Sequence, residues 1–109
     1  MTEPTSRIEI SKSALKNNLD FLRSYLGSQI KISSVIKGNA YGHGIEIFVP
    51  LAEELGINHF SVFSADEAYR AQLALASSSD IMIMGMVDND ALEWVIEEEI
   101  EFYVFETDR

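Results

Sequence analysis

The chain has 109 residues, which suffices for one domain or a part of one. Its 8 lysine and arginine residues against 18 aspartate and glutamate residues give a net charge of −10, which argues against nucleic acid and anionic membranes as partners. It has no cysteine, which excludes disulfides and cysteine-based metal sites, and no stretch that reads as a secretory signal or a membrane span, so a soluble cytoplasmic protein is expected.

The N-terminal segment predicts a short strand followed by a helix. Residues 7–10 alternate polar and isoleucine side chains, which is typical of a strand. Ser11 or Ser13 is expected to cap the helix that follows, and Gly27 is expected to end it. The apolar stripe of this helix consists of Leu15, Leu19, Leu22 and Leu26.

Residues 30–44 predict a strand followed by a glycine-rich turn, and they contain the main candidate functional residues. Successive side chains leave a strand on opposite sides, so one face of this predicted strand carries Ile30, Ile32, Ser34 and Ile36. Lys37 belongs to the other face and ends the strand. If helices cover the isoleucine face, Lys37 lies on the inner side of the sheet, at the C-terminal edge where parallel α/β folds collect their active sites.

The residues after Lys37 add groups suited to an anionic ligand. Tyr41 supplies a phenol, and Gly42 and Gly44 supply backbone amides just before a predicted helix start at Ile45. Exposed amides at a helix N-terminus favour a phosphate or a carboxylate. These groups together suggest a phosphorylated carbonyl cofactor bound through Lys37, whereas periodicity alone would favour an ordinary solvated lysine.

The stretch after this turn predicts a helix and then a strand. Apolar residues at helical spacing begin at Ile45, and Gly56 is expected to end the helix. Pro50 lies inside this pattern and should kink the helix or mark its true start near Val49. Residues 57–63 are predicted to form the next strand.

Two further pairs of helix and strand complete the chain. Ser64 and Glu67 have the spacing of a capping box, which predicts a helix through about Ala76. Residues 81–85 are expected to form a strand buried on both faces, and residues 102–105 a last strand. The helix between these two strands is expected to be capped by Asp88, Asn89 or Asp90.

The order of these elements predicts the fold class. Strand centres recur about every 21 to 27 residues, a rhythm typical of βα units with short loops in a parallel sheet. A complete (β/α)8 barrel needs about 250 residues. The sequence therefore predicts an α/β fold that is the N-terminal part of a TIM-like barrel, incomplete in this chain, with an exposed edge at residues 102–105.

Residues 35–44 read Val-Ile-Lys-Gly-Asn-Ala-Tyr-Gly-His-Gly. This run resembles the pyridoxal-phosphate lysine motif of the alanine racemase family (fold-type III), V-K-A-[ND]-A-Y-G-H-G, and departs from it at Gly38, where many members carry alanine. Residues 16–19 are also similar to the first helix of that family. The resemblance implies that residues 1–109 are the N-terminal portion of the cofactor-binding barrel, and that the strand at 7–10 belongs with a C-terminal β domain that this chain lacks.

The resemblance also implies roles for three residues. Lys37 would hold pyridoxal 5'-phosphate as a Schiff base and remove the α proton of the D enantiomer, while a tyrosine of the partner subunit serves the L enantiomer. The Tyr41 phenol would hydrogen-bond the cofactor phosphate, and Met84 would lie against the cofactor ring. The implied enzyme is an alanine racemase, a homodimer when complete, that supplies D-alanine for peptidoglycan synthesis. Residues 1–109 alone are expected to be inactive, because the second base lies beyond them.

Other functions and roles remain to be weighed. Two alternatives are a racemase of serine, lysine or ornithine and a non-catalytic pyridoxal-phosphate-binding barrel. The ending of the motif, residues 41–44, resembles the racemases more than the non-catalytic barrels. The glycine spacing does not fit a nucleotide-binding loop. His43 and His59 are the only histidines and no carboxylate cluster has metal-ligand spacing, so no metal site is predicted. The resemblance gives His43 a role in shaping the loop, and His59 is expected to be structural. Met82, Met84 and Met86 share one strand face and are expected to pack in the core.

Overall fold

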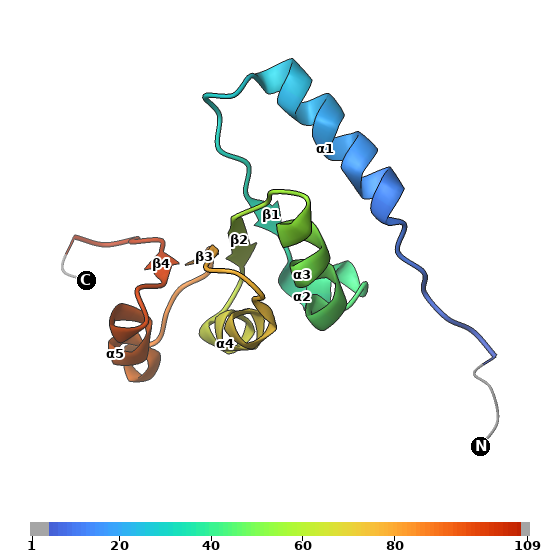
Figure 1. Ribbon diagram of the computed structural model, residues 1–109. Helices are drawn as coiled ribbons and strands as arrows, with labels where there is room; N and C mark the ends of the chain where they lie inside the picture. Colours follow the sequence, from blue (N-terminus) through green and yellow to red (C-terminus); the bar gives the residue numbers. More distant parts are fainter. Residues whose placement is uncertain (1–4, 108–109) are drawn as a thin grey trace.

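Figure 1 shows the computed structural model of the chain, in which residues 5–107 are described. In chain order the elements are α1 (Lys12–Leu26), β1 (Ser34–Val35), α2 (Lys37–Tyr41), α3 (Ile45–Glu54), β2 (His59–Val62), α4 (Ala65–Ala74), β3 (Asp80–Ile83), α5 (Asn89–Glu97) and β4 (Glu101–Phe102). The strands form one parallel sheet in the order β1-β2-β3-β4. Helices α3, α4 and α5 lie together along the sheet, whereas much of α1 extends away from them (Figure 1).

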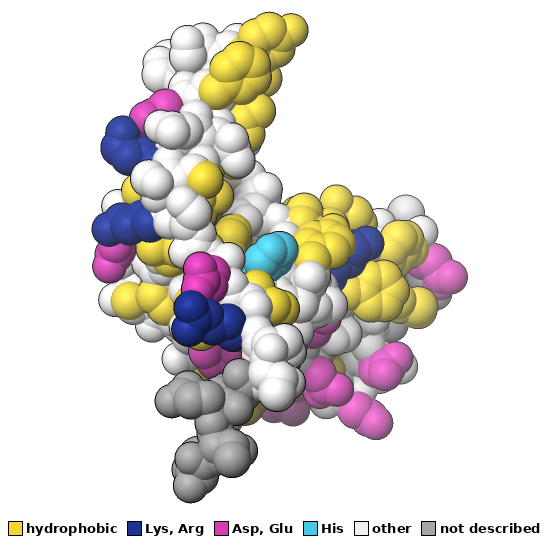
Figure 2. All heavy atoms as spheres, turned by 90° about the vertical axis from the view of Figure 1, so that its right-hand side faces the viewer, with side chains coloured by type: hydrophobic (Ala, Val, Ile, Leu, Met, Phe, Trp, Pro, Cys, Tyr) yellow, Lys and Arg dark blue, Asp and Glu magenta, His cyan; other side chains and the backbone are white. Residues whose placement is uncertain are grey.

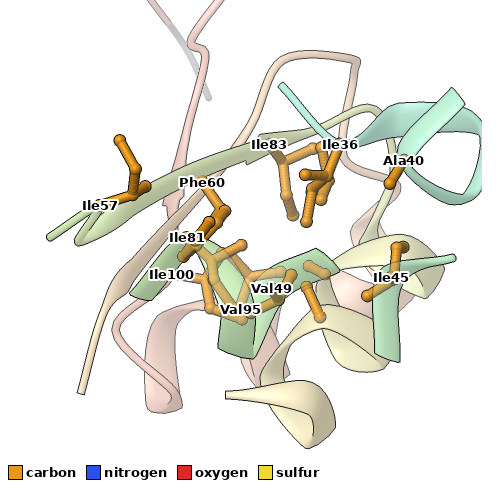
Figure 3. Packing of buried hydrophobic residues seen from close by; sticks show 14 of the residues in the cluster. Ile36, Ala40, Ile45, Val49, Ile57, Phe60, Ile81, Ile83, Val95 and Ile100 are labelled. Atoms are coloured by element: carbon orange, nitrogen blue, oxygen red, sulfur yellow. The ribbon is translucent and has the colours of Figure 1, made fainter. Parts of the chain in front are cut away.

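Alternation along the strands sorts side chains between the two faces of the sheet. Those on the helix side are buried and comprise Ile36, Phe60, Val62, Ile81 and Ile83. Figure 3 shows strand residues of this set pointing toward Val49 of α3 and Val95 of α5. Burying each such side chain contributes about 1.5–3 kcal/mol. The predicted division is confirmed for Ile36, which is buried on the helix side, but it is wrong for Ile30, which is 54% exposed because the strand begins only at Ser34.

Capping hydrogen bonds predicted from the sequence are present at the starts of α1 and α4. Ser11 accepts a backbone hydrogen bond in the first turn of α1 at 3.2 Å, and Gly27 ends that helix with a φ of 87°. The Ser64 hydroxyl accepts a hydrogen bond from the Glu67 backbone N–H, also at 3.2 Å. Asp88 occupies the N-cap position of α5, but its side chain makes no capping hydrogen bond. Local capping therefore helps to set where α1 and α4 begin.

Helix α3 begins earlier than one of the predicted alternatives. It starts at Ile45 and continues through Pro50, so a start near Val49 is wrong. A proline inside a helix removes one backbone hydrogen bond. Ile45 and Val49 are both fully buried against the sheet, and this packing holds the turn that precedes the proline in helical form.

Several elements are shorter than the sequence predicts. The edge strands β1 and β4 span only Ser34–Val35 and Glu101–Phe102, because each has a single neighbouring strand to pair with. The predicted strand at residues 7–10 is not formed, since this segment pairs with no strand in the described part of the chain, and Ile8 is exposed. Helix α4 ends at Ala74, earlier than predicted.

Helix α1 is attached to the rest of the chain along only part of its apolar stripe. Leu15 and Leu19 join the core, and Lys12 pairs with Glu54 of α3 at 2.6 Å. Hydrophobic side chains gather over the last turns of α1, at the top of the view in Figure 2. The exposed residues there are Phe21, Leu22, Tyr25 and Leu26. The predicted leucine stripe is thus buried in its first half and open in its second.

Candidate active site

Lys37 directly follows the buried Ile36 at the C-terminal end of β1, and its own side chain is exposed. The chain then forms a left-handed turn, with φ values of 61° at Gly38, 58° at Asn39, 56° at Ala40 and 56° at Tyr41. This conformation costs a residue other than glycine about 1–2 kcal/mol. Three consecutive residues of that kind persist only where surrounding contacts hold them.

Two side chains of the turn itself supply such contacts. The Asn39 Oδ1 atom accepts a hydrogen bond from the Ile45 N–H at 3.0 Å, which ties the turn to the first residue of α3. The His43 ring lies with Nδ1 at 2.9 Å from the Ala40 carbonyl oxygen, to which it donates when that nitrogen carries the proton. This contact fits a role for His43 in shaping the loop.

A third contact comes from Glu67 in the first turn of α4. A capping box predicts that this side chain reaches back to the Ser64 N–H. Its carboxylate instead accepts hydrogen bonds from the Gly38 N–H at 2.8 Å and the Phe63 N–H at 2.7 Å. The spacing in the sequence identified the cap but not these partners, because Gly38 lies 29 residues away along the chain.

The glycine amides of the turn are not available to an anion. The Gly42 N–H lies 3.0 Å from the Gly38 carbonyl oxygen and 3.1 Å from that of Asn39. The Gly44 N–H donates to the Asn39 carbonyl at 2.9 Å, and the Ile45 N–H is taken by the Asn39 side chain. The prediction that these amides bind an anion is therefore wrong. The left-handed turn directs its own carbonyl groups toward the two glycine N–H groups.

The C-terminal ends of three neighbouring strands bring the remaining candidate residues to one edge. Lys37, Phe63 and Met84 follow the ends of β1, β2 and β3, which run parallel and in register. Tyr41 is 63% exposed and Phe63 is 59% exposed, while Met84 is half-buried. This edge thus combines a primary amine, a phenol and apolar side chains on an open surface.

The three methionines of this region differ in burial. Met82 and Met84 are half-buried, whereas Met86 is 63% exposed. Val87, the next residue, is buried in its place. The prediction that Met86 packs in the core is therefore wrong. The strand ends at Ile83, so the alternation of its side chains between the two faces does not extend to Met86.

Four hydrogen-bonded side chains link the N-terminal ends of β1, β2 and β4 to Ser61 within β2. The Ser61 and Ser33 hydroxyl oxygens are 2.6 Å apart, Ser33 Oγ is 2.7 Å from His59 Nδ1, and His59 Nε2 is 2.6 Å from Glu101 Oε1. With Glu101 ionised and the imidazole neutral, each group donates to the next, from Ser61 to Glu101. His59 is thus the structural histidine that was predicted. Its partners could not be predicted, since they lie 26 and 42 residues away.

Replacing His59 by alanine is expected to lower the free energy of unfolding by about 1–3 kcal/mol, because Ser33 and Glu101 lose the partner that joins them. Urea unfolding of the full-length protein, followed by circular dichroism, measures this effect. Asn58→Ala changes an exposed neighbour and is the control, with an expected change within about 0.5 kcal/mol. Equal unfolding free energies for the two variants would contradict the structural role of His59.

Residues 5–107 contain no candidate metal centre and no helix that could span a membrane. No three His, Cys, Asp or Glu side chains of this range come close enough together to bind a metal ion. Its helices are all too short or too polar to cross a bilayer.

Comparison with known sequences gives consistent matches. A family profile described as "Alanine racemase, N-terminal domain" matches residues 10–109. An alanine racemase of Leptospira interrogans is 44% identical over 85 residues, which cover 78% of this chain and 22% of that protein. One from Francisella tularensis is 33% identical over 93 residues, covering 85% of this chain and 24% of that protein.

Solved structures show the same likeness in three dimensions. Alanine racemase from Oenococcus oeni matches with a TM-score of 0.83 and 28% identity, over 94% of this chain and 28% of that one. The enzyme from Bartonella henselae, described with covalently bound pyridoxal phosphate, matches with a TM-score of 0.75 and 26% identity, over 85% of this chain and 27% of that one. The chain therefore spans about a quarter of the length of the proteins it matches.

Proposed function

The chain belongs to the alanine racemase family, whose N-terminal domain it matches over residues 10–109, and we propose that it is part of a pyridoxal-phosphate-dependent racemase that interconverts L-alanine and D-alanine. Its fold is the N-terminal part of the (β/α)8 barrel of that family. The observation that carries the proposal is the position of Lys37, an exposed amine at the C-terminal end of a barrel strand. We also propose that the biological role of this racemase is to supply D-alanine for peptidoglycan synthesis.

The residues at this edge fit pyridoxal phosphate in their chemistry. The cofactor needs an amine for covalent attachment, hydrogen-bond donors for its phosphate and apolar side chains along its ring. Lys37 offers the amine, the exposed Tyr41 phenol a donor, and Phe63 and Met84 apolar surface beside them. Since the amides of the glycine turn are already bonded, further donors for the phosphate must come from other residues.

Three residues of this chain have a proposed task in the reaction. Lys37 Nζ would hold the cofactor covalently, and the same amine, once free, would remove the α proton of D-alanine. The Tyr41 hydroxyl would donate to the phosphate and so fix the position of the cofactor. Met84 would pack against the ring and keep water from that face. When bound, the cofactor serves as the electron sink that stabilises charge at the α carbon.

The remainder of the proposal concerns the complete enzyme. The family's second base, a tyrosine from a partner subunit, would act on L-alanine, which makes the complete enzyme a homodimer. Residues 7–10 would pair with a C-terminal β domain. Their lack of a strand partner in the described part of the chain, together with the exposure of Ile8, supports this pairing.

Reduction with borohydride in the presence of pyridoxal phosphate tests the proposal. In the full-length protein we expect one stable pyridoxyl label, found by peptide mass mapping on Lys37. Incubation of a separate, unreduced sample of the full-length protein with L-alanine and pyridoxal phosphate should form D-alanine faster than serine, lysine or ornithine is racemised. A label on another lysine, or no racemisation of any of the four amino acids, would overturn the proposal.

A further inference from the structure

The hydrogen-bond ladder between β1 and β2 breaks off just before Lys37. The Ile36 N–H donates to the Ser61 carbonyl at 2.9 Å, as a parallel ladder requires. If the ladder continued, the Phe63 N–H would donate to the Ile36 carbonyl, and the Gly38 N–H would donate to the Phe63 carbonyl. Neither of these two bonds is formed.

Both carbonyl groups have other donors. The Ile36 carbonyl accepts from the Ala40 N–H at 2.8 Å, inside the left-handed turn. The Phe63 carbonyl accepts from the Gly85 N–H at 3.0 Å, on the side of β3. Two backbone donors, the Gly38 and Phe63 N–H groups, are thereby left without the acceptors that the ladder would have given them.

Glu67 supplies both missing acceptors. Its Oε2 atom accepts from the Gly38 N–H at 2.8 Å, and its Oε1 atom accepts from the Phe63 N–H at 2.7 Å. The residue is itself fixed at the start of α4, where its backbone N–H donates to the Ser64 hydroxyl. One carboxylate therefore joins the ends of β1 and β2 at the point where the chain turns left-handed.

We propose that Glu67 is a positioning residue for Lys37: its carboxylate fixes where β1 separates from β2, and so sets the start of the turn that presents the lysine amine. The inference rests on the proposed function, in which Lys37 binds the cofactor. The N–H that Glu67 holds belongs to the peptide joining Lys37 to Gly38, so a shift of this peptide moves the lysine with it. A displacement of about 1 Å at a reacting group can cost about 100-fold in rate.

Substitutions can separate the bridge from a general effect on the fold. Glu67→Gln keeps the length, but its NH2 group would face a backbone N–H and could not accept. Glu67→Asp keeps the charge but is one methylene too short to reach both donors. The matched control is Glu46→Gln, because Glu46 also lies in the first turn of a helix. Its carboxylate binds Arg70 at 2.6 Å and 3.0 Å, and this hydrogen bonding holds the pKa of Glu46 below its ordinary value.

In the full-length protein, Glu67→Gln is expected to lower kcat for alanine racemisation about tenfold or more, with KM changed by less than about threefold. Hydrogen exchange in the cofactor-free protein gives an independent readout. A peptide covering residues 37–42 should exchange about tenfold faster in Glu67→Gln than in the wild type or Glu46→Gln. Glu67→Asp should show the same two effects, and it replaces the glutamine variant if that variant fails to fold.

If the wild-type protein carries the pyridoxyl label at Lys37, two outcomes overturn the role of Glu67 and leave the proposed function standing. One is that the Glu67 variants match Glu46→Gln in both kcat and exchange. The other is that exchange is faster while kcat is unchanged, because the turn would then be held without consequence for the reaction. A wild-type protein without the label at Lys37 overturns the proposed function, and this inference with it.

Discussion

Lys37→Arg is expected to lower the rate of alanine racemisation by the full-length protein on the order of 1000-fold or more. The guanidinium group keeps the charge but stays protonated at any working pH. It can neither bind the cofactor covalently nor take the α proton of the substrate. Loss of a positioned base alone typically costs about 10²–10⁴-fold. Chromatographic separation of the two alanine enantiomers measures the rate in either direction.

The control for this variant is Lys31→Arg. Lys31 precedes the same strand, and its Nζ atom lies 3.7 Å from an Asp80 carboxylate oxygen, at the opposite end of the sheet from Lys37. We expect this change to leave the rate within about twofold, since an exposed ion pair tolerates either cation. If Lys37→Arg kept more than about a tenth of the wild-type rate, the assignment of the cofactor lysine would be wrong.

Much of the fold could be predicted because it depends on patterns within short stretches. The alternation placed Ile36 toward the helices, and spacing placed the cap of α4 at Ser64 and limited the cap of α1 to Ser11 or Ser13. Pairing between distant segments could not be predicted in the same way. Residues 7–10 have the pattern of a strand, yet a strand also needs a partner, and no described segment supplies one.

Sequence reasoning could predict which candidate residues lie together when they are neighbours along the chain. It could not predict contacts between segments that are far apart in the sequence. Lys37 and Tyr41 belong to one turn, so their proximity follows from the sequence. The fate of the Gly42 and Gly44 amides depends on the left-handed conformation of the residues before them, which glycine content alone does not reveal. The Glu67 bridge depends on two strands lying side by side, which only the assembled sheet provides.

Gly85→Ala is expected to lower the free energy of unfolding by about 3 kcal/mol. Gly85 follows β3, where its backbone lies close to the end of β2. A methyl group at this position would lie 2.3 Å from the Phe63 carbonyl oxygen and 3.3 Å from the Phe63 ring. The carbonyl belongs to the backbone and already accepts the Gly85 N–H at 3.0 Å, so relief requires the two chain segments to separate and that bond to break.

Gly38→Ala is the matched comparison for Gly85→Ala, because it places the same methyl group on a glycine of the same edge. Nothing lies within 4 Å of that methyl position, so the only cost is the φ of 61°, about 1–2 kcal/mol. Urea unfolding of both variants in the full-length protein should therefore rank Gly85→Ala as clearly less stable. The opposite ranking would mean that backbone strain in the lysine turn, rather than close packing of β2 against β3, limits stability at this edge.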